Sequence, residues 1–346
     1  MRATTRGLRA PVLGGLAALA AWAGSPAPAE AQSIVERIRA RGFVQCGAST
    51  GVPGLSRADE GGVWRGMDSD VCRAAAVAIF GDKDRIRFTP LVTAARLPAL
   101  QTGEIDVLSR TTTWTYSRDA AVRFVTTTIY DGDAILYRKR LNVRSMRDFD
   151  GATFCVTGGG GLPAQKLTAI EETNRITLRR VVFENPTQAR DAYMSGRCDA
   201  YITDGTAAAG ARATIARNPD EHEMMPVDTR PEPLGIAVPR GDDRWFDIVR
   251  WSFFALLWAE ERGITAANAE EMARTGDREV RRVLGEEGFG RPLGLDDRWV
   301  LNVIRQLGNY GEMWERNLGN GSPLRLARNR NALWRDGGLM ISPPWD

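Results

Sequence analysis

The chain has 346 residues, of which 43% are hydrophobic and 26% are charged. This composition is typical of a soluble globular protein and excludes a largely disordered one. The formal net charge is only +3, and nothing in the pattern of basic residues indicates a nucleic-acid-binding surface.

The N-terminal segment has the features of a secretory signal peptide. A cationic start, MRATTRGLR, precedes an apolar stretch, APVLGGLAALAAWAG, that is too short to span a bilayer. Ala29-Glu30-Ala31 forms an A-x-A cleavage site before Gln32, with no lipid-anchor cysteine and no twin-arginine pair. We therefore expect export to the periplasm through the Sec pathway with removal of residues 1–31. A retained N-terminal anchor is the alternative.

The next part of the chain alternates short apolar runs with amphipathic stretches. The runs predict strands at 43–49, 85–92 and 104–111, and the stretches predict helices at 69–81 and 94–103. Asp68 or Ser69 is placed to cap the first helix, and Gly81 follows its end.

The same alternation returns further along the chain. It predicts strands at 152–158, 176–183 and 198–204, and helices at 162–173, 187–196 and 205–217. Strands that alternate with helices of about ten residues predict an α/β fold of two units with largely parallel sheets.

The two units also repeat one local order. Residues 99–113 and 192–206 each run from a helix through a glycine turn to an aspartate and a buried strand. In open α/β sheets, ligands bind beyond the carboxyl ends of the strands. We therefore expect both strand ends to face a single cleft.

The C-terminal part begins with a strongly apolar helix, predicted at 247–263. Its central run, WSFFALLWA, is too short to cross a membrane and indicates a core helix. The tail from residue 308 is rich in Gly, Asn and Arg. We expect it to cover a lobe through Trp314, Trp334 and Trp345.

Four cysteines in an exported chain predict two disulfides. Three pairings are possible, and we favour Cys46–Cys72 and Cys155–Cys198 because each pair lies in neighbouring predicted elements. The chain has no CxxC spacing and a single histidine, which disfavours zinc sites, redox motifs and Ser-His-Asp catalysis. We expect no metal and no cofactor.

Four consecutive glycines, residues 158–161, follow the strand at 152–158. A phosphate-binding loop is excluded, because Lys166 lies too far along the chain and no Ser or Thr follows it. The run also lacks the glycine spacing of a dinucleotide-binding loop. An anion-binding nest of backbone N–H groups at a helix start remains possible, and the alternative is a flexible turn.

Hydroxyl and charged side chains follow the predicted strand at 104–111. Thr111 and Thr113 can hydrogen-bond a small polar ligand, and Arg118 can bind a carboxylate through two parallel bonds. In the alternative interpretation, Arg118 pairs with Asp119 at the surface and the threonines only fill a turn.

Asp204 ends the predicted strand at 198–204. It can cap the helix that follows, or it can face the cleft and bind an ammonium group. An arginine opposite an aspartate is the arrangement that a zwitterionic α-amino acid requires.

Several stretches of the chain resemble the periplasmic amino-acid-binding proteins of ABC importers, solute-binding family 3, and within it the general L-amino-acid-binding subgroup. The resemblance extends over residues 34–346 and is carried by residues 41–56, 61–82, 99–119, 181–204, 232–251 and 308–319. It implies a type II periplasmic binding fold, in which two α/β lobes are joined by two crossing hinge segments. The implied lobe limits are 32–138 with 236–346 for lobe 1, and 139–235 for lobe 2.

The resemblance also implies roles for individual residues. Arg118 corresponds to the arginine that binds the ligand α-carboxylate, and Asp204 to the aspartate that binds the α-ammonium group. The other implied ligand-binding positions are Thr111, Thr113, Arg96, Thr157, Gly160, Gly161 and Ser49. Arg96 corresponds to a position that in some members reaches an acidic ligand side chain.

The chain departs from the subgroup at the glycine run, where its relatives carry a threonine-rich loop. It also has Thr111 and Ser49 where the subgroup usually has Asn, and Leu55 where it has Phe. These departures place the implied broad ligand range in question.

The implied activity is capture of an L-amino acid by lobe closure and its delivery to a membrane permease, by a monomer that is not an enzyme. One alternative is a periplasmic dehydratase of the cyclohexadienyl or arogenate type, with Glu184 or Asp204 as its general acid. The other is a sensory or scaffold protein that has lost its ligand affinity.

Overall fold

The computed structural model describes residues 33–159, 162–227 and 230–346. The predicted signal peptide, residues 1–31, and two glycines of the run, Gly160 and Gly161, lie outside the described residues. The elements described below all belong to one unit, Ile34–Asp346.

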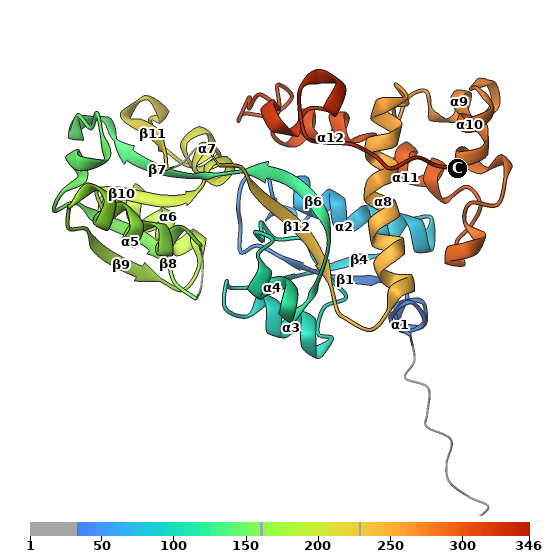
Figure 1. The fold of residues 1–346 in the computed structure, drawn as a ribbon, viewed down its shortest axis with the longest axis horizontal. Helices are drawn as coiled ribbons and strands as arrows, with labels where there is room; N and C mark the ends of the chain where they lie inside the picture. Colours follow the sequence, from blue (N-terminus) through green and yellow to red (C-terminus); the bar gives the residue numbers. More distant parts are fainter. Residues whose placement is uncertain (1–32, 160–161, 228–229) are drawn as a thin grey trace, which may run out of the picture. The chain divides into compact units, whose positions relative to one another are not determined.

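The first sheet has the strand order β4-β1-β5-β12-β6 (Figure 1). Its strands are β1 (Val44–Ala48), β4 (Ile86–Pro90), β5 (Val107–Leu108), β6 (Arg123–Asp131) and β12 (Glu232–Val238). β1 pairs with β4 and β5 in parallel, whereas β12 is antiparallel to both of its neighbours. The strands expected at 43–49 and 85–92 are confirmed. The strand expected at 104–111 is much shorter, because the chain leaves the sheet after Leu108.

The second sheet has the order β11-β7-β10-β8-β9. Its strands are β7 (Asp133–Arg138), β8 (Thr153–Thr157), β9 (Arg179–Phe183), β10 (Ala200–Asp204) and β11 (His222–Pro226). The three predicted strands, β8, β9 and β10, are parallel, and β7 is antiparallel to β10 and β11. Both sheets are therefore parallel where the chain alternates strand and helix, and antiparallel where it crosses over.

Helices surround each sheet. The N-terminal half has α1 (Ile34–Arg41), α2 (Met67–Phe80), α3 (Arg96–Thr102) and α4 (Tyr116–Ala121). The second sheet has α5 (Leu162–Asn174), α6 (Pro186–Met194) and α7 (Gly205–Thr214). The predicted helices are confirmed, and Gly81 ends α2 in the left-handed conformation. The predicted cap is wrong, because Gly66 precedes α2 and Asp68 lies inside the helix. The Asp68 carboxylate instead accepts a hydrogen bond from the Thr111 N–H.

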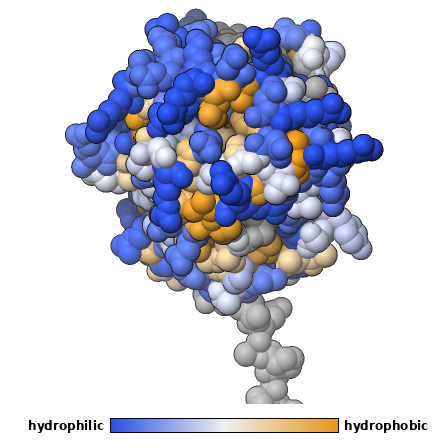
Figure 2. Space-filling model, turned by 90° about the vertical axis from the view of Figure 1, so that its left-hand side faces the viewer, coloured by the Kyte–Doolittle hydropathy of each residue, from blue (hydrophilic) through white to orange (hydrophobic). Residues whose placement is uncertain are grey.

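The predicted core helix is α8 (Asp243–Glu261), which packs against α2, β6 and α11 (Trp299–Leu307). Trp245, Ile248 and Leu256 on α8 are fully buried. No helix in the part of the chain that the structure describes is long and apolar enough to cross a membrane. The face shown in Figure 2 is mainly hydrophilic, with apolar residues in small separate patches.

Two segments join the sheets. β6 of the first sheet continues through Gly132 into β7 of the second, and the chain returns between β11 and β12. Two α/β lobes with two crossing segments are the type II periplasmic binding fold. The lobe limits implied at 138/139 and 235/236 stay a prediction, and sheet membership favours limits closer to Gly132 and Glu232.

Both predicted disulfides are confirmed. Cys46 on β1 is bonded to Cys72 on α2, and Cys155 on β8 is bonded to Cys198 just before β10. Each bond therefore lies within one lobe, and neither restrains movement of one lobe against the other.

The C-terminal tail packs on the first lobe. It follows α9 (Ala269–Thr275), α10 (Arg278–Arg281) and α11, and it contains α12 (Tyr310–Asn317). Trp314 and Trp345 are buried as expected, and the Trp345 ring lies among aromatic rings of α8 and α11. The expectation for Trp334 is wrong, because it is 58% exposed.

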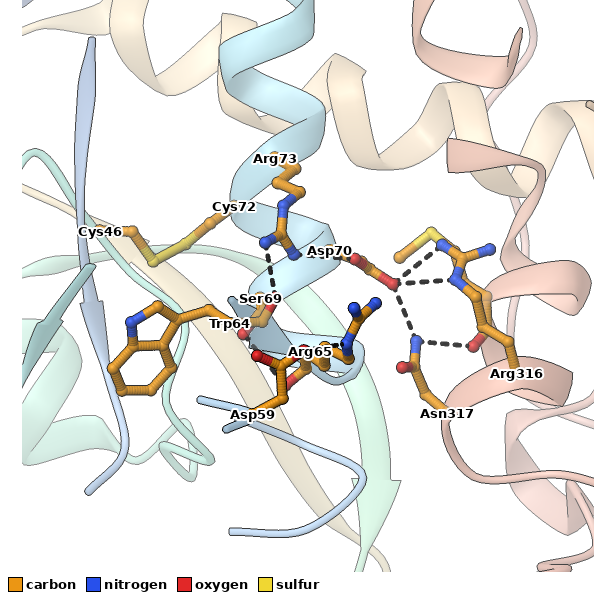
Figure 3. Close-up of polar contacts among 11 residues, drawn as sticks. Cys46, Asp59, Trp64, Arg65, Ser69, Asp70, Cys72, Arg73, Arg316 and Asn317 are labelled. Carbon is orange, nitrogen blue, oxygen red and sulfur yellow. Dashed lines mark hydrogen bonds and ion pairs between the residues drawn. A yellow bond between two sulfur atoms is a disulfide. The ribbon is translucent and has the colours of Figure 1, made fainter. Parts of the chain in front are cut away.

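A buried carboxylate on α2 joins the tail to the first lobe (Figure 3). Asp70 Oδ2 accepts hydrogen bonds from Arg316 and from Asn317 of α12, at 2.9 and 2.8 Å. Its other oxygen accepts from Arg73, which also donates to the carbonyl oxygen of Trp64 in β3 (Trp64–Arg65). Strand β3 pairs with β2 (Arg57–Ala58).

Candidate ligand-binding site

A small cleft lies between the two lobes at the carboxyl ends of β5 and β10. It encloses a cavity of about 50 Å³. The lining combines arginines, threonines and one carboxylate with a few apolar side chains: Val52, Thr93, Arg96, Arg110, Thr111, Thr113, Arg118, Thr157, Pro163, Pro186, Ile202, Thr203, Asp204 and Ala207. The structure thus brings together Arg118, Asp204, Arg96 and the three predicted threonines, as the sequence implied.

On the lobe 1 side, Asp68 of α2 accepts two hydrogen bonds from the turn that follows β5. Its Oδ2 accepts from the backbone N–H of Thr111 at 2.9 Å, and its Oδ1 accepts from the Ser109 hydroxyl at 3.3 Å. Thr111 has a φ of 43°, which is strained for a β-branched residue. Burial raises the pKa of Asp68 to about 7, against the lowering effect of these hydrogen bonds and of Arg110. Asp68 therefore shapes the turn, a role that the sequence did not reveal.

Arg118 lies on α4 and turns inward. It is 9% exposed, and its Nη1 donates to the Thr113 carbonyl oxygen at 2.9 Å. Asp119, the surface partner considered from sequence, instead accepts from the backbone N–H of Phe124 through Oδ1. Burial lowers the pKa of Arg118, while Asp204 and Glu232 act in the opposite direction. The guanidinium group is thus held at the cleft by the same turn that carries the threonines.

Two further arginines share the cavity. Arg110, which sequence analysis did not select, is 3% exposed and donates through Nε to the Leu91 carbonyl oxygen at 2.8 Å. Burial lowers its pKa to about 10. Arg96 is 6% exposed and makes no hydrogen bond or ion pair with the residues that the structure describes. Burial and the neighbouring Arg110 and Arg118 lower the pKa of Arg96 well below its ordinary value.

Asp204 faces the arginines from lobe 2. It precedes α7, but its side chain does not cap the helix. Asp131 does so instead, because its Oδ2 accepts from the backbone N–H and the hydroxyl of Thr206. The Asp204 carboxylate therefore lines the cleft and does not cap α7. Burial raises its pKa well above the ordinary value, and Asp131, Asp133 and Glu232 raise it further.

The glycine run reaches across to lobe 1. Gly158 donates its N–H to the Phe183 carbonyl oxygen at 2.9 Å. Gly159 has a φ of +76°, and a Cβ there would lie 3.1 Å from the Cβ of Ala94. Glycine at 159 is therefore required by the backbone conformation and by close approach of the lobes. Whether the run binds an anion stays a prediction, since Gly160 and Gly161 lie outside the described residues.

The lobes also touch at the rim of the cleft. Thr187 Oγ1 on α6 donates to the Thr50 carbonyl oxygen at 3.2 Å, and Arg190 Nη1 donates to the Gly51 carbonyl oxygen at 3.1 Å. These contacts join the two lobes next to the cleft. Ser49 is buried and is not among the lining residues; its hydroxyl accepts from the Gly51 N–H at 3.4 Å.

A two-lobed fold with a charged interlobe cleft defines a ligand-binding protein of the periplasmic binding class. The chain belongs to the bacterial extracellular solute-binding proteins, family 3, whose family model matches residues 44–282.

Full-length relatives show the same relationship. The chain is 46% identical to the general L-amino acid-binding periplasmic protein AapJ of Rhizobium johnstonii, over 92% of this chain and 94% of the relative. It is 41% identical to the glutamate/glutamine/aspartate/asparagine-binding protein BztA of Rhodobacter capsulatus, over 95% and 96%.

Solved structures agree in fold. An ABC transporter periplasmic binding protein from Brucella ovis, with glutathione bound, superposes with a TM-score of 0.86 at 43% identity, covering 91% of this chain and 99% of that one. An ancestral amino acid-binding protein, a precursor of cyclohexadienyl dehydratase, is more distant, with a TM-score of 0.55 at 25% identity, covering 67% and 95%.

Proposed function

We propose that the protein is the periplasmic binding component of an ABC importer and that it captures an L-amino acid between its lobes. The observation that carries this proposal is the placement of Arg118 and Asp204 on opposite sides of one closed cavity. Arg118 binds the α-carboxylate and Asp204 binds the α-ammonium group. Thr111, Thr113 and Thr157 complete the hydrogen bonds of the ligand.

The excess of positive charge in the cavity favours an acidic ligand. Arg118 pairs with the α-carboxylate of the ligand. Asp204 is the one carboxylate among the described lining residues, so the lining offers no second anion to Arg96 and Arg110. Arg96 in particular is buried without a described partner. A side-chain carboxylate, as in glutamate or aspartate, supplies that anion. The name of the Rhodobacter relative supports this choice, and the glutathione bound to the Brucella protein extends it to γ-glutamyl compounds.

The proposed mechanism is binding without chemical conversion. Without ligand, the arginines of lobe 1 and Asp204 of lobe 2 are desolvated in the cavity. The ligand supplies both counterions, so that closure is biased by contacts made only in the closed state. Hydrogen bonds to charged groups contribute roughly 1.5–3 kcal/mol each, which is sufficient for micromolar binding when several act together.

The names of the relatives, which are periplasmic and amino-acid-binding, support the proposed setting. Export through the Sec pathway, action in the periplasm as a monomer, and docking of the closed form on a membrane permease are all expected of such a component. The permease would accept the amino acid when the lobes reopen.

A dehydratase of the cyclohexadienyl type is the second candidate, because a carboxyl group with a raised pKa, such as that of Asp204, suits a general acid. Glu184, the other acid considered, is exposed and does not line the cavity. Turnover of prephenate or arogenate by the purified protein would favour the enzyme over the importer.

Isothermal titration with the twenty L-amino acids and glutathione tests the proposal. We expect saturable heat with glutamate and aspartate, and none with Arg118→Ala. Silence toward the whole panel would favour a protein that has lost its ligand. Unchanged affinity in Arg118→Ala would show that the site is assigned wrongly.

A further inference from the structure

Lys166, the lysine that follows the glycine run, contacts two carboxylates, Asp133 and Glu232, that lie beside Asp204 of the cleft. It lies on α5 of lobe 2, and its Nζ is 3.0 Å from Asp133 Oδ2. The same ammonium group donates a hydrogen bond to Glu232 Oε1. The Asp133 and Glu232 side chains are 0% and 10% exposed, so these contacts form a buried ion-pair network.

Three carboxylates meet at this point. Asp133 stands directly opposite Asp204 on the antiparallel strands β7 and β10. Asp133, Asp204 and Glu232 each place an oxygen within 4.8 Å of the others. Like charges this close repel each other strongly when water is excluded. Neither oxygen of Asp133 accepts a well-angled hydrogen bond from the described residues, so the nearby Lys166 ammonium compensates its charge.

The network continues from Lys166 to the carboxylate-binding side of the cleft. Glu232 lies on β12, a crossing strand, and its Oε2 accepts from the Thr113 hydroxyl at 3.3 Å. The carbonyl oxygen of Thr113 in turn accepts from Arg118. A lysine of lobe 2 is therefore connected, through one hinge residue and one turn, to the arginine of lobe 1.

The charged groups around the network shift the pKa of Asp133 in opposite directions. Burial, Glu232 and Asp131 together raise the pKa of Asp133 to about 6, against the lowering effect of Lys166. The charged groups that face the network from the elements packed around it are Asp131, Asp133, Asp204, Glu232, Arg96 and Arg118.

We propose that Lys166 is a positioning residue for ligand binding. It compensates the charges of Asp133 and Glu232, which leaves Asp204 as the carboxylate that receives the ligand ammonium group. It also keeps Glu232 on Thr113, so that Arg118 stays available to the ligand carboxylate. This inference rests on the proposed function.

Lys166→Met tests the inference by removing the charge while keeping much of the side-chain volume. Removal of one partner from a buried ion pair leaves an uncompensated charge, so we expect affinity for L-glutamate to fall about tenfold or more at pH 8. At pH 6 Asp133 takes up a proton in part, since its pKa is raised to about 6, and the loss should be several-fold smaller. Lys166→Arg should retain affinity within about threefold, because its charge can meet the same carboxylates. Lys139→Met, which removes an exposed lysine of the same lobe, is the matched control and should bind like the wild type.

Chemical rescue separates positioning from general damage to the fold. Propylammonium should restore part of the affinity of Lys166→Met, whereas tetramethylammonium, which cannot donate a hydrogen bond, should not. Should Lys166→Met fold poorly, the double variant Lys166→Met with Asp133→Asn removes one of the uncompensated charges; it should fold, recover part of the affinity at pH 8, and show a smaller difference between pH 6 and pH 8. An equal loss at pH 6 and pH 8 without rescue, or no loss at all, would overturn the inference. Absence of binding by the wild type would instead refute the proposed function.

Discussion

The two sides of the cleft carry opposite charges and are built in different ways. Lobe 1 brings three arginines into the cavity, and the turn at Arg110 and Thr111 donates hydrogen bonds to the buried carboxylate of Asp68. The hinge and lobe 2 bring a group of carboxylates around Asp204, with Lys166 among them. Also in lobe 2, Gly158 donates its backbone N–H to the Phe183 carbonyl oxygen.

This difference explains how a small ligand can control closure. Burial lowers the pKa of the arginines on one side and raises that of Asp204 on the other, so removal from water destabilises the charged form on each side. A zwitterion neutralises both sides at once.

The largest expected effect is on the carboxylate side. Asp204→Asn removes the partner of the ligand ammonium group, and we expect affinity to fall by about a hundredfold or more, given the strength of a desolvated charge pair. The ligand-free protein should at the same time become more stable at pH 8. A carboxyl group with a raised pKa loses stability as the pH rises from its unfolded value through its folded value, and Asn removes this loss.

Titration calorimetry and thermal unfolding at pH 5 and pH 8 measure both quantities. Lower stability of Asp204→Asn at pH 8, together with lost binding, would indicate a structural role for Asp204 rather than ligand recognition.

On the arginine side, the effect of Arg96→Gln should depend on the ligand. We expect affinity for glutamate to fall about tenfold or more, while affinity for glutamine changes little, because only the acidic side chain loses its counterion. A ratio of the two dissociation constants that does not change would contradict the assignment of Arg96 to the ligand side chain.

The role of Asp68 in the turn after β5 can be tested through the pH dependence of the free energy of unfolding. The free energy of unfolding should fall as the pH rises from about 4, the ordinary pKa of aspartate, to about 7, the pKa of Asp68 in the folded protein. Asp68→Asn should show a smaller fall over this range, because Asn keeps an acceptor for the Thr111 N–H without a charge. Urea unfolding at several pH values measures the difference, and parallel curves for the two proteins would contradict it.

The smallest effect concerns the glycine loop. Gly159→Ala introduces a Cβ at a positive φ and against Ala94 of lobe 1. We expect a loss of about 1 kcal/mol in stability from the backbone and a further affinity loss of several-fold from the hindered closure. Gly151→Ala is the matched control, since Gly151 has a φ of +73° and nothing within 4 Å of the added Cβ. Equal affinities of the two variants would show that contact with Ala94 does not limit closure.

Much of this protein was accessible from its sequence. The alternation of strands and helices predicted the parallel parts of both sheets, because apolar periodicity is a local property. The repeated order in 99–113 and 192–206 predicted that two strand ends face one cleft, and Thr111, Thr113 and Asp204 line that cleft. Pairing of cysteines in neighbouring elements gave both disulfides.

Other features depended on tertiary structure. Asp68 has the sequence context of a helix cap, and only the approach of the turn at Thr111 makes it a support of the site. Arg110 gave no signal in its motif, and Trp334 resembles the buried tryptophans of the tail although it is exposed. The sequence suggests only a phosphate-loop role for Lys166 and excludes it, because Lys166 lies too far along the chain from the glycine run. Its partners, Asp133 and Glu232, are distant in sequence and meet it where the chain crosses between the lobes, because charge compensation in a buried site depends on distance in space rather than along the chain.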